Sequence, residues 1–199
     1  RGNIAHQDVH LDVSPALSTW GPGLVYSRLL RFRSGPQVEL PSRAVECDLC
    51  ESWKMESPTS YLFRLREGVR WQAIDPVGGR ELTSEDVAYS YVRQSQPGLP
   101  NAPLLQNVDT VQPLAPLELR ITLKSPDADI LSLLADGHTK VVAREAVERA
   151  GDLRDDRDDR PFLKSKDSRD TGDDDKKAPE KADAKTSEKD SGNEEGGDK

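Results

Sequence analysis

Apolar and polar residues alternate most regularly in two short segments of the chain, 61–65 and 117–123. Tyr61, Phe63 and Leu65 share one parity in the first segment, with Arg64 between them. The apolar positions of the second segment are Leu117, Leu119, Ile121 and Leu123. A period of two is typical of a strand with one buried and one exposed face. The pattern therefore predicts two strands of a sheet that is dry on one side and wet on the other, as antiparallel sheets are.

A helix is predicted to begin at Thr83, after a turn rich in glycine and proline. Thr83 can cap the free amides, and Asp86 follows three residues later, which is the arrangement of a capping box. Val87, Tyr91 and Val92 are predicted to form the apolar stripe of this helix. Two shorter helices are predicted at 127–135 and 143–150, each closed by a glycine.

Weaker patterns complete the predicted order of elements. Val9, Leu11 and Val13 alternate with polar residues, which predicts a first strand whose other, solvent-facing side carries His6, Asp8, His10 and Asp12. A short helix after Gly23 is predicted to lead into a strand near 30–32. The segment 45–55 is predicted to be partly extended and to bring Leu49, Trp53 and Met55 towards the core. The expected core also contains Leu62 or Phe63, Val87, Tyr91, Leu119, Ile121, Leu131 and Leu134.

Composition divides the 199 residues into two parts. Hydrophobic residues make up 34% of the chain and charged residues 32%. Residues 155–199 contain 16 acidic and 11 basic side chains and hardly any large apolar one beyond Phe162 and Leu163. Such a segment buries too little apolar surface to offset its ordering entropy. We therefore predict a disordered charged tail at 155–199 behind about 150 ordered residues.

Charge and hydropathy exclude several classes of protein. The net charge is −8, and no stripe of Lys and Arg interleaves with aromatic residues, so nucleic-acid binding is not expected. No apolar run approaches the ~20 residues of a membrane span. The sequence begins at Arg1 and shows no signal peptide, which does not by itself indicate a cytoplasmic protein.

Candidate reactive residues are few. Cys47 and Cys50 form a C-x-x-C pair, which leaves open a redox pair, half of a zinc site, a local disulfide or two small structural residues. Zinc needs four ligands, and the three histidines lie far from the pair in sequence. His6 and His10 would share a metal only on a helix, and no nucleophile–base set or phosphate loop stands out. Neither an enzyme nor a metal or other cofactor is expected.

Five segments in order resemble one protein family. They are Cys50–Trp53 (CESW), Leu65–Trp71 (LREGVRW), Gly79–Ser90 (GRELTSEDVAYS), Leu119–Ala128 (LRITLKSPDA) and Val142–Val147 (VAREAV). They resemble stretches of the family 5 extracytoplasmic solute-binding proteins, the peptide-, oligopeptide- and nickel-type receptors of ABC importers. The resemblance covers residues 3–154, and five motifs in one order are far more specific than any one of them.

The resemblance implies an α/β fold of the type II periplasmic-binding-protein class. Residues 1–43 would supply the first strand and helix of lobe one, and residues 44–154 an extra α/β subdomain on that lobe. The second lobe, which would close on the ligand, has no counterpart before the tail. We therefore expect exposed apolar surface on 24–30 and weak or no solute binding by this chain alone.

The function implied is that of a monomeric receptor outside the cytoplasm, which binds peptides or similar solutes for an ABC permease in the membrane. By the resemblance, Asp12, Val13 and Ser14 would lie along an extended ligand, with Asp12 facing a cationic group. Ordinary loop residues are the competing interpretation of this segment. Trp20 and Trp71 are candidates for stacking on a ligand, although core positions suit them better. The alternative function is a small interaction protein that acts through its acidic tail.

Overall fold

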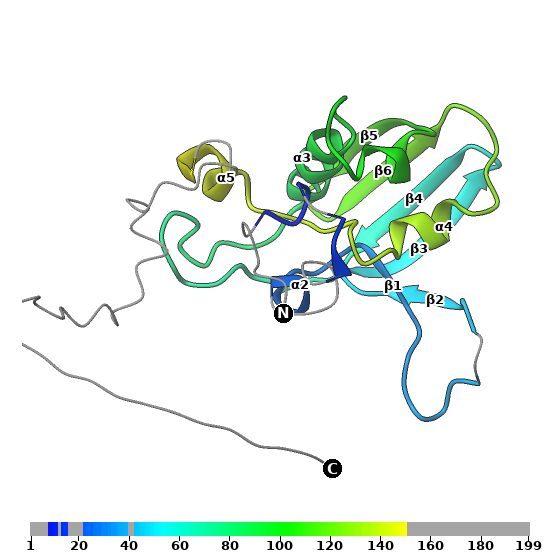
Figure 1. Ribbon diagram of the computed structural model, residues 1–199, viewed down its shortest axis with the longest axis horizontal. Helices are drawn as coiled ribbons and strands as arrows, with labels where there is room; N and C mark the ends of the chain where they lie inside the picture. The colour runs from blue at the N-terminus through cyan, green and yellow to red at the C-terminus, as the bar shows by residue number, and fades with distance from the viewer. Residues whose placement is uncertain (1–7, 12, 16–21, 40–41, 151–199) are drawn as a thin grey trace, which may run out of the picture.

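A four-stranded antiparallel sheet is the main feature of the computed structural model, which describes residues 8–11, 13–15, 22–39 and 42–150 (Figure 1). Its strands, in spatial order, are β3 (Cys50–Ser57), β4 (Ser60–Leu65), β6 (Glu118–Leu123) and β5 (Val108–Ala115). The hairpins β3–β4 and β5–β6 join through β4 and β6. The two strands with the clearest alternation are thus the two central strands, as a sheet with one buried face requires.

The predicted alternation puts the apolar residues of both central strands on one face. Tyr61 lies opposite Ile121 and Phe63 opposite Leu119, so these four side chains share a face. All four are buried. The other face is polar; there the Arg120 guanidinium donates a hydrogen bond to the Glu56 carboxylate, Nε to Oε2, at 2.9 Å.

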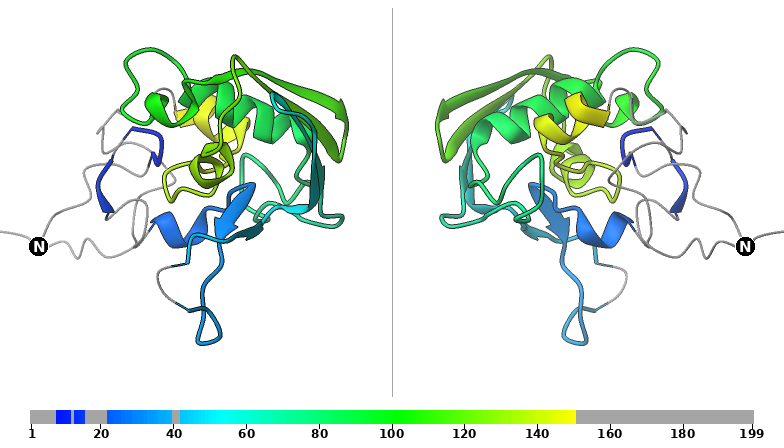
Figure 2. Two further views of the ribbon diagram at one scale, coloured as in Figure 1. Left: turned by 90° about the vertical axis from the view of Figure 1, so that its right-hand side faces the viewer. Right: turned by 90° about the vertical axis from the view of Figure 1, so that its left-hand side faces the viewer.

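Helix α3 (Ser84–Gln94) covers the β5–β6 half of the buried face (Figure 2). The predicted capping box is present, and the Thr83 backbone N–H donates to the Asp86 carboxylate at 2.9 Å. Val87 and Tyr91 are buried as predicted, but Val92 is exposed. Val92 follows Val87 by five residues and so lies roughly 140° around the helix from it. Ser90 and Gln94 occupy the inner face instead.

The expected core positions on β3 are only partly confirmed. Leu49 is buried, whereas Trp53 is exposed and Met55 is 54% exposed. Both side chains lie on the core-facing side, because Trp53 pairs with Phe63 and Met55 with Tyr61. They are exposed because β3 is an edge strand, and α3 packs over the opposite half of the sheet.

Short elements surround the sheet. They are α2 (Pro22–Val25), β1 (Leu30–Phe32), β2 (Val45–Cys47), η1 (Ala102–Leu105), α4 (Ile130–Leu134) and α5 (Arg144–Ala150). β1 and β2 form a separate two-stranded antiparallel sheet beside the main one, and the chain that follows β1 projects away from both (Figure 1). The predicted helix at 127–135 begins later, at Ile130, because the Asp127 carboxylate accepts the Asp129 backbone N–H at 2.8 Å and holds a turn there.

The segment 24–30 is divided between surface and core. Leu24 is 75% exposed and Val25 is exposed too, as expected for surface that needs a partner. Leu29 and Leu30 are fully buried, which contradicts the expectation of exposure. They are covered because β1 packs beside α4 and joins the same core as the sheet.

Candidate functional site

The segment proposed to face a ligand, 12–14, follows a buried turn rather than a strand. Residues 8–11 form a turn in which the Leu11 backbone N–H donates to the Asp8 carbonyl at 3.2 Å. The predicted strand is therefore wrong over these residues. Asp8 and His10, expected on a solvent-facing side, are both buried. His6 and Asp12 lie outside the described residues.

An ion pair anchors this turn to α3. Both oxygens of the Asp8 carboxylate accept from the Arg93 guanidinium; Nη1 donates to Oδ1 at 3.0 Å, and Nη2 donates to Oδ2. Oδ1 also accepts the His10 backbone N–H at 3.0 Å. Arg93 and Asp8 are both buried, and a buried charge is tolerated only where it is paired and hydrogen-bonded in this way.

The ring of His10 completes the anchor. Its Nδ1 lies 2.8 Å from Nη1 of Arg93, which can only donate, and its Nε2 lies 2.8 Å from the Lys140 carbonyl, which can only accept. The ring is therefore neutral, with its one hydrogen on Nε2. Burial lowers the pKa of His10 from 6.5 to about 4; the Arg93 charge acts in the same direction, against the hydrogen bond to Lys140.

Segments far apart in the sequence meet around this turn. The dark blue turn lies beside α3 and the stretch that leads into α5 (Figure 1). Asn101 donates to the Val9 carbonyl at 3.4 Å. Lys140 donates through Nζ to the Tyr26 carbonyl at 2.9 Å, and the Val141 N–H donates to the Ser27 carbonyl at 2.9 Å. The turn thus joins the N-terminal segment to the part of the chain that carries the sheet.

Val13 and Ser14 emerge from this anchor at the surface. The Val13 side chain is 57% exposed, and Ser14 is partly exposed. The Val13 carbonyl lies 3.2 Å from Nε2 of His138, whose Nδ1 lies 2.8 Å from the Asp136 carboxylate. A carbonyl oxygen has two lone pairs, so one stays available to a ligand.

Sequence reasoning missed Arg93, Lys140 and His138 as partners of the candidate segment. Each of them lies at least 83 residues away in sequence from the residue that it contacts. The shortest separation is that between Arg93 and His10. No local pattern marks Arg93, because a spacing of two residues turns its side chain roughly 200° around the helix from Tyr91.

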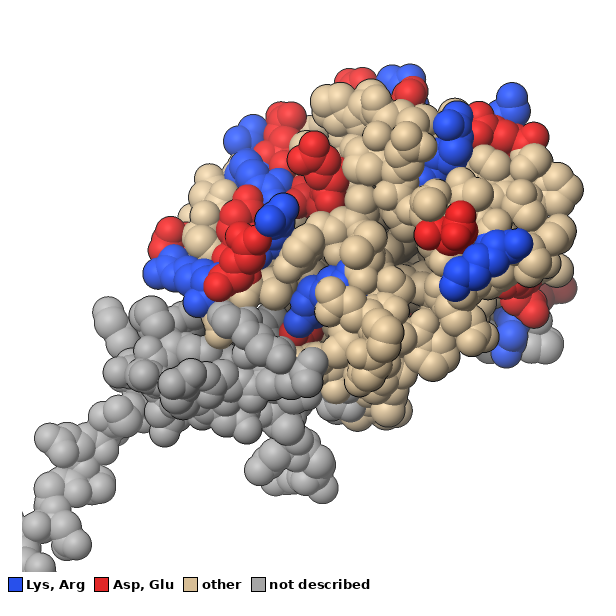
Figure 3. All heavy atoms as spheres, turned by 90° about the horizontal axis from the view of Figure 1, so that it is seen from above, with Lys and Arg blue, Asp and Glu red and all other residues tan. Residues whose placement is uncertain are grey.

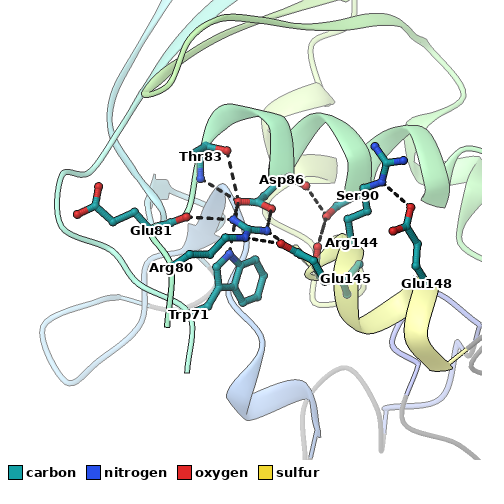
Figure 4. A network of polar contacts seen from close by, with 10 residues as sticks. Trp71, Arg80, Glu81, Thr83, Asp86, Ser90, Arg144, Glu145 and Glu148 are labelled. Atoms are coloured by element: carbon teal, nitrogen blue, oxygen red, sulfur yellow. Dashed lines mark hydrogen bonds and ion pairs between the residues drawn. The ribbon is translucent and has the colours of Figure 1, made fainter. Parts of the chain in front are cut away.

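A second polar network fixes the position of α5 (Figure 4). Arg80 donates to Asp86 at 2.6 and 2.8 Å and to Glu145 at 2.5 and 2.8 Å. The guanidinium also lies over the ring of Trp71, 5.9 Å from its centroid, and Trp71 Nε1 donates to Asp86 at 3.4 Å. These hydrogen bonds raise the pKa of Arg80 and lower that of Glu145. Trp71 therefore serves this network, whereas Trp20 lies outside the described residues.

The cysteine pair forms a disulfide between Cys47 and Cys50. It closes the turn from β2 to β3, and this turn donates one hydrogen bond to a neighbouring segment and accepts another. The Asp48 N–H donates to the Leu29 carbonyl at 3.1 Å, and Arg66 Nε donates to the Asp48 carbonyl at 2.9 Å. The local disulfide is thus the correct alternative among those the sequence left open. Within the described residues, no group of three or more His, Cys, Asp or Glu side chains is arranged to hold a metal ion.

The described surface carries charges of both signs (Figure 3). On the face in Figure 3, acidic and basic side chains of the described residues are interspersed. None of the helices in the described ranges combines the length and apolar character needed to cross a membrane.

Comparison with known proteins identifies the family. The family described as "Bacterial extracellular solute-binding proteins, family 5 Middle" matches residues 44–187, which is more than half of the chain and extends beyond residue 154. A curated relative, the HTH-type transcriptional regulator SgrR of Pectobacterium atrosepticum, is 33% identical over 98 residues, which are 49% of this chain and 16% of the regulator.

Solved receptors have the same fold. MoaA of A. tumefaciens R10, in complex with mannopinic acid, aligns with a TM-score of 0.62 and 25% identity over 74% of this chain and 29% of its own. DppA of Helicobacter pylori, in complex with the peptide STSA, aligns with a TM-score of 0.59 and 20% identity over 73% of this chain and 30% of its own. This chain therefore spans less than a third of these relatives.

These findings confirm the predicted fold class, since the mixed helix-and-sheet arrangement is that of the type II periplasmic-binding proteins. The predicted tail lies outside the described residues. With a family match over more than half of its length and a fold shared with solved receptors, the chain belongs to the bacterial extracellular solute-binding proteins of family 5.

Proposed function

We propose that this chain contributes one wall of the binding site of an extracytoplasmic receptor, which takes up peptides or similar solutes and delivers them to an ABC permease. The family match over residues 44–187 carries the proposal. Peptide STSA in DppA and mannopinic acid in MoaA indicate the chemical range of solutes, which are small, polar and rich in hydrogen-bonding groups. The role is binding without catalysis, with no cofactor and no nucleic-acid partner.

The ligand-facing residues are proposed to be Asp12, Val13 and Ser14. The buried turn before them supports this, because Arg93 and the Lys140 carbonyl hold the side chains of Asp8 and His10 and so limit the entropy that a ligand would have to offset. Exposed residues next to a rigid anchor suit strand addition, in which main-chain groups pair with a peptide. Asp12 would then meet a cationic group of the solute.

The division into 1–43, 44–154 and 155–199 remains part of the proposal. A two-lobed receptor binds by closing both walls on the solute and excluding water. The 199 residues match less than a third of the solved receptors, so we expect this chain alone to be a monomer that binds solute weakly.

Heteronuclear NMR with millimolar peptide tests the site. We expect tri- and tetrapeptides to shift the backbone amides of 12–14 in the full chain, and Asp12→Asn to weaken the effect of peptides with a free amino terminus. Lys54→Gln, which changes one charge on the exposed strand β3, is the matched control and leaves the shifts unchanged. Shifts confined to another surface would overturn the assignment of the site, and submicromolar binding would overturn the weak affinity.

A second candidate function follows from the 33% identity to a transcriptional regulator. The same binding module would then sense a solute inside the cell. The Cys47–Cys50 disulfide favours the receptor, since disulfides persist in oxidising compartments and are rare in the cytosol. Alkylation of the natively expressed protein, followed by mass spectrometry, separates the two. An oxidised pair supports the receptor, and two free thiols support the intracellular sensor.

A further inference from the structure

His138 contacts the proposed ligand-facing segment through two groups that can only accept hydrogen bonds. Its Nδ1 lies 2.8 Å from Oδ1 of Asp136, and its Nε2 lies 3.2 Å from the carbonyl oxygen of Val13. The same Asp136 oxygen accepts the His138 backbone N–H at 2.9 Å, so two donors hold the carboxylate in place. Hydrogen bonding to His138 lowers the pKa of Asp136, which keeps the carboxylate ionised and unable to donate.

This geometry determines the protonation state of the ring. A neutral imidazole has one N–H and one lone pair, so it satisfies one acceptor and turns its lone pair towards the other. Both contacts of His138 are satisfied only when both ring nitrogens carry hydrogen. His10 is the contrasting case in the same molecule, because one of its nitrogens faces a donor, Arg93, and the other an acceptor, Lys140.

We propose that His138 is a positioning residue for the ligand-facing segment and holds the Val13 carbonyl only as an imidazolium. The inference rests on the proposed function, since it concerns the same segment. When the ring loses a proton, the proton leaves Nε2, because Nδ1–H faces the negative Asp136. Two lone pairs then oppose each other between Nε2 and the Val13 oxygen, and this hydrogen bond is lost. The Val13 carbonyl is therefore held in acid and released in alkali.

The charges around His138 act in both directions. Asp136 favours the charged ring. Two cations lie near the same carboxylate: Arg28, which donates to the Ala135 carbonyl at 3.1 Å and lowers the pKa of Asp136, and Lys140, whose pKa burial lowers to about 8. As neighbours of Asp136 they disfavour a further positive charge on the ring. Asp48 accepts the Arg28 backbone N–H at 3.1 Å and offsets part of that positive charge. The hydrogen bond at 2.8 Å to the ionised Asp136 carboxylate favours the charged ring by direct contact.

The test is a pH titration of the full chain by NMR, with two signals followed together. The ring nitrogens of His138, assigned with His138→Gln, report its protonation. The carbonyl carbon of Val13, observed through the Ser14 amide, reports the hydrogen bond. We expect both ring nitrogens to be protonated at low pH, and Nε2 to deprotonate with the same midpoint at which the Val13 signal changes. In His138→Gln the Val13 signal should no longer titrate.

A matched pair of variants tests the role of the carboxylate. Asp136→Asn is expected to move both midpoints to lower pH by about one unit. Asp109→Asn, which removes a carboxylate from the exposed strand β5, leaves both midpoints in place. A ring that is neutral while the Val13 contact persists, or midpoints that do not coincide, would overturn the proposal. Absence of peptide binding at 12–14 would overturn the proposed function and leave these titrations unaffected, so the two failures are distinguishable.

Discussion

His10 is buried with a neutral ring, and this neutral state stabilises the fold more than a protonated ring would. Its two partners, Arg93 and the Lys140 carbonyl, are satisfied only by the neutral tautomer. A second proton would place two positive groups 2.8 Å apart in the protein interior, where charges are weakly screened. The residue therefore links the anchor of the ligand-facing segment to pH.

The free energy of unfolding is expected to fall as the pH is lowered from 6.5 to about 4. The pKa of His10 is lowered in the folded state, so the unfolded chain takes up the proton first over this range. The loss amounts to about 3 kcal/mol over the window, at up to ~1.4 kcal/mol per pH unit. Urea unfolding followed by circular dichroism at several pH values measures it.

The control for this prediction is His10→Gln, which keeps an amide donor for Lys140 and an oxygen for Arg93 but does not titrate. The difference in slope between the two proteins belongs to His10 alone, because His6, His138 and the carboxyl groups titrate in both. Equal slopes between pH 4 and 6.5 would show that His10 is not held neutral.

At the scale of elements, polar contacts join α3 to Arg80, to α5 and to the stretch that precedes α5. Asp86 accepts from the Thr83 N–H within the capping box and from Arg80, which also binds Glu145 on α5 (Figure 4). Ser90 donates to the Val142 carbonyl at 3.2 Å and accepts the Val142 N–H at 2.9 Å, which adds a second attachment of the stretch before α5. α5 has no fully buried residue; Val147 is partly buried against Val9 and Val142, and these polar contacts add to that attachment.

Arg80→Gln is expected to lower the free energy of unfolding by about 2 kcal/mol, because the substitution leaves the buried Asp86 carboxylate without its bidentate partner. This figure is reduced from the cost of a fully buried pair because the Arg80 side chain is 34% exposed. Urea unfolding at pH 7 measures the change.

Arg64→Gln is the matched control for Arg80→Gln. It removes the same guanidinium from an ion pair with Glu51 in which both side chains are exposed, and we expect a change within ~0.5 kcal/mol. Similar losses in the two variants would show that Arg80 acts only as a surface charge.

At the scale of the whole molecule, two observations point in opposite directions on whether residues 155–199 pack on the domain before them. Their composition predicts disorder, whereas the family match continues to residue 187.

Deletion of 155–199 is expected to leave the thermal unfolding midpoint of the remaining chain unchanged, because a segment so poor in apolar residues adds no core. Differential scanning calorimetry of both proteins measures this. A clear drop in the midpoint would indicate that the matched residues up to 187 pack on the domain. Loss of a binding partner without a change in midpoint would instead support the interaction protein with an active tail.

The sequence by itself determined the elements that are specified by a few consecutive residues. Alternation predicted β4 and β6, and local capping chemistry predicted the start of α3, because a period and a cap are properties of a few consecutive residues. The ordered motifs also indicated the family and with it the class of fold.

Only the tertiary structure decided which polar residues are buried and which apolar ones are not. Asp8 and His10 lie in the interior because Arg93 and Lys140, from distant parts of the chain, satisfy their hydrogen bonds. Met55 is exposed because β3 is at the edge of the sheet. Strand order and ion pairs over more than 80 residues leave no local pattern, so the periodicity of a segment cannot show them.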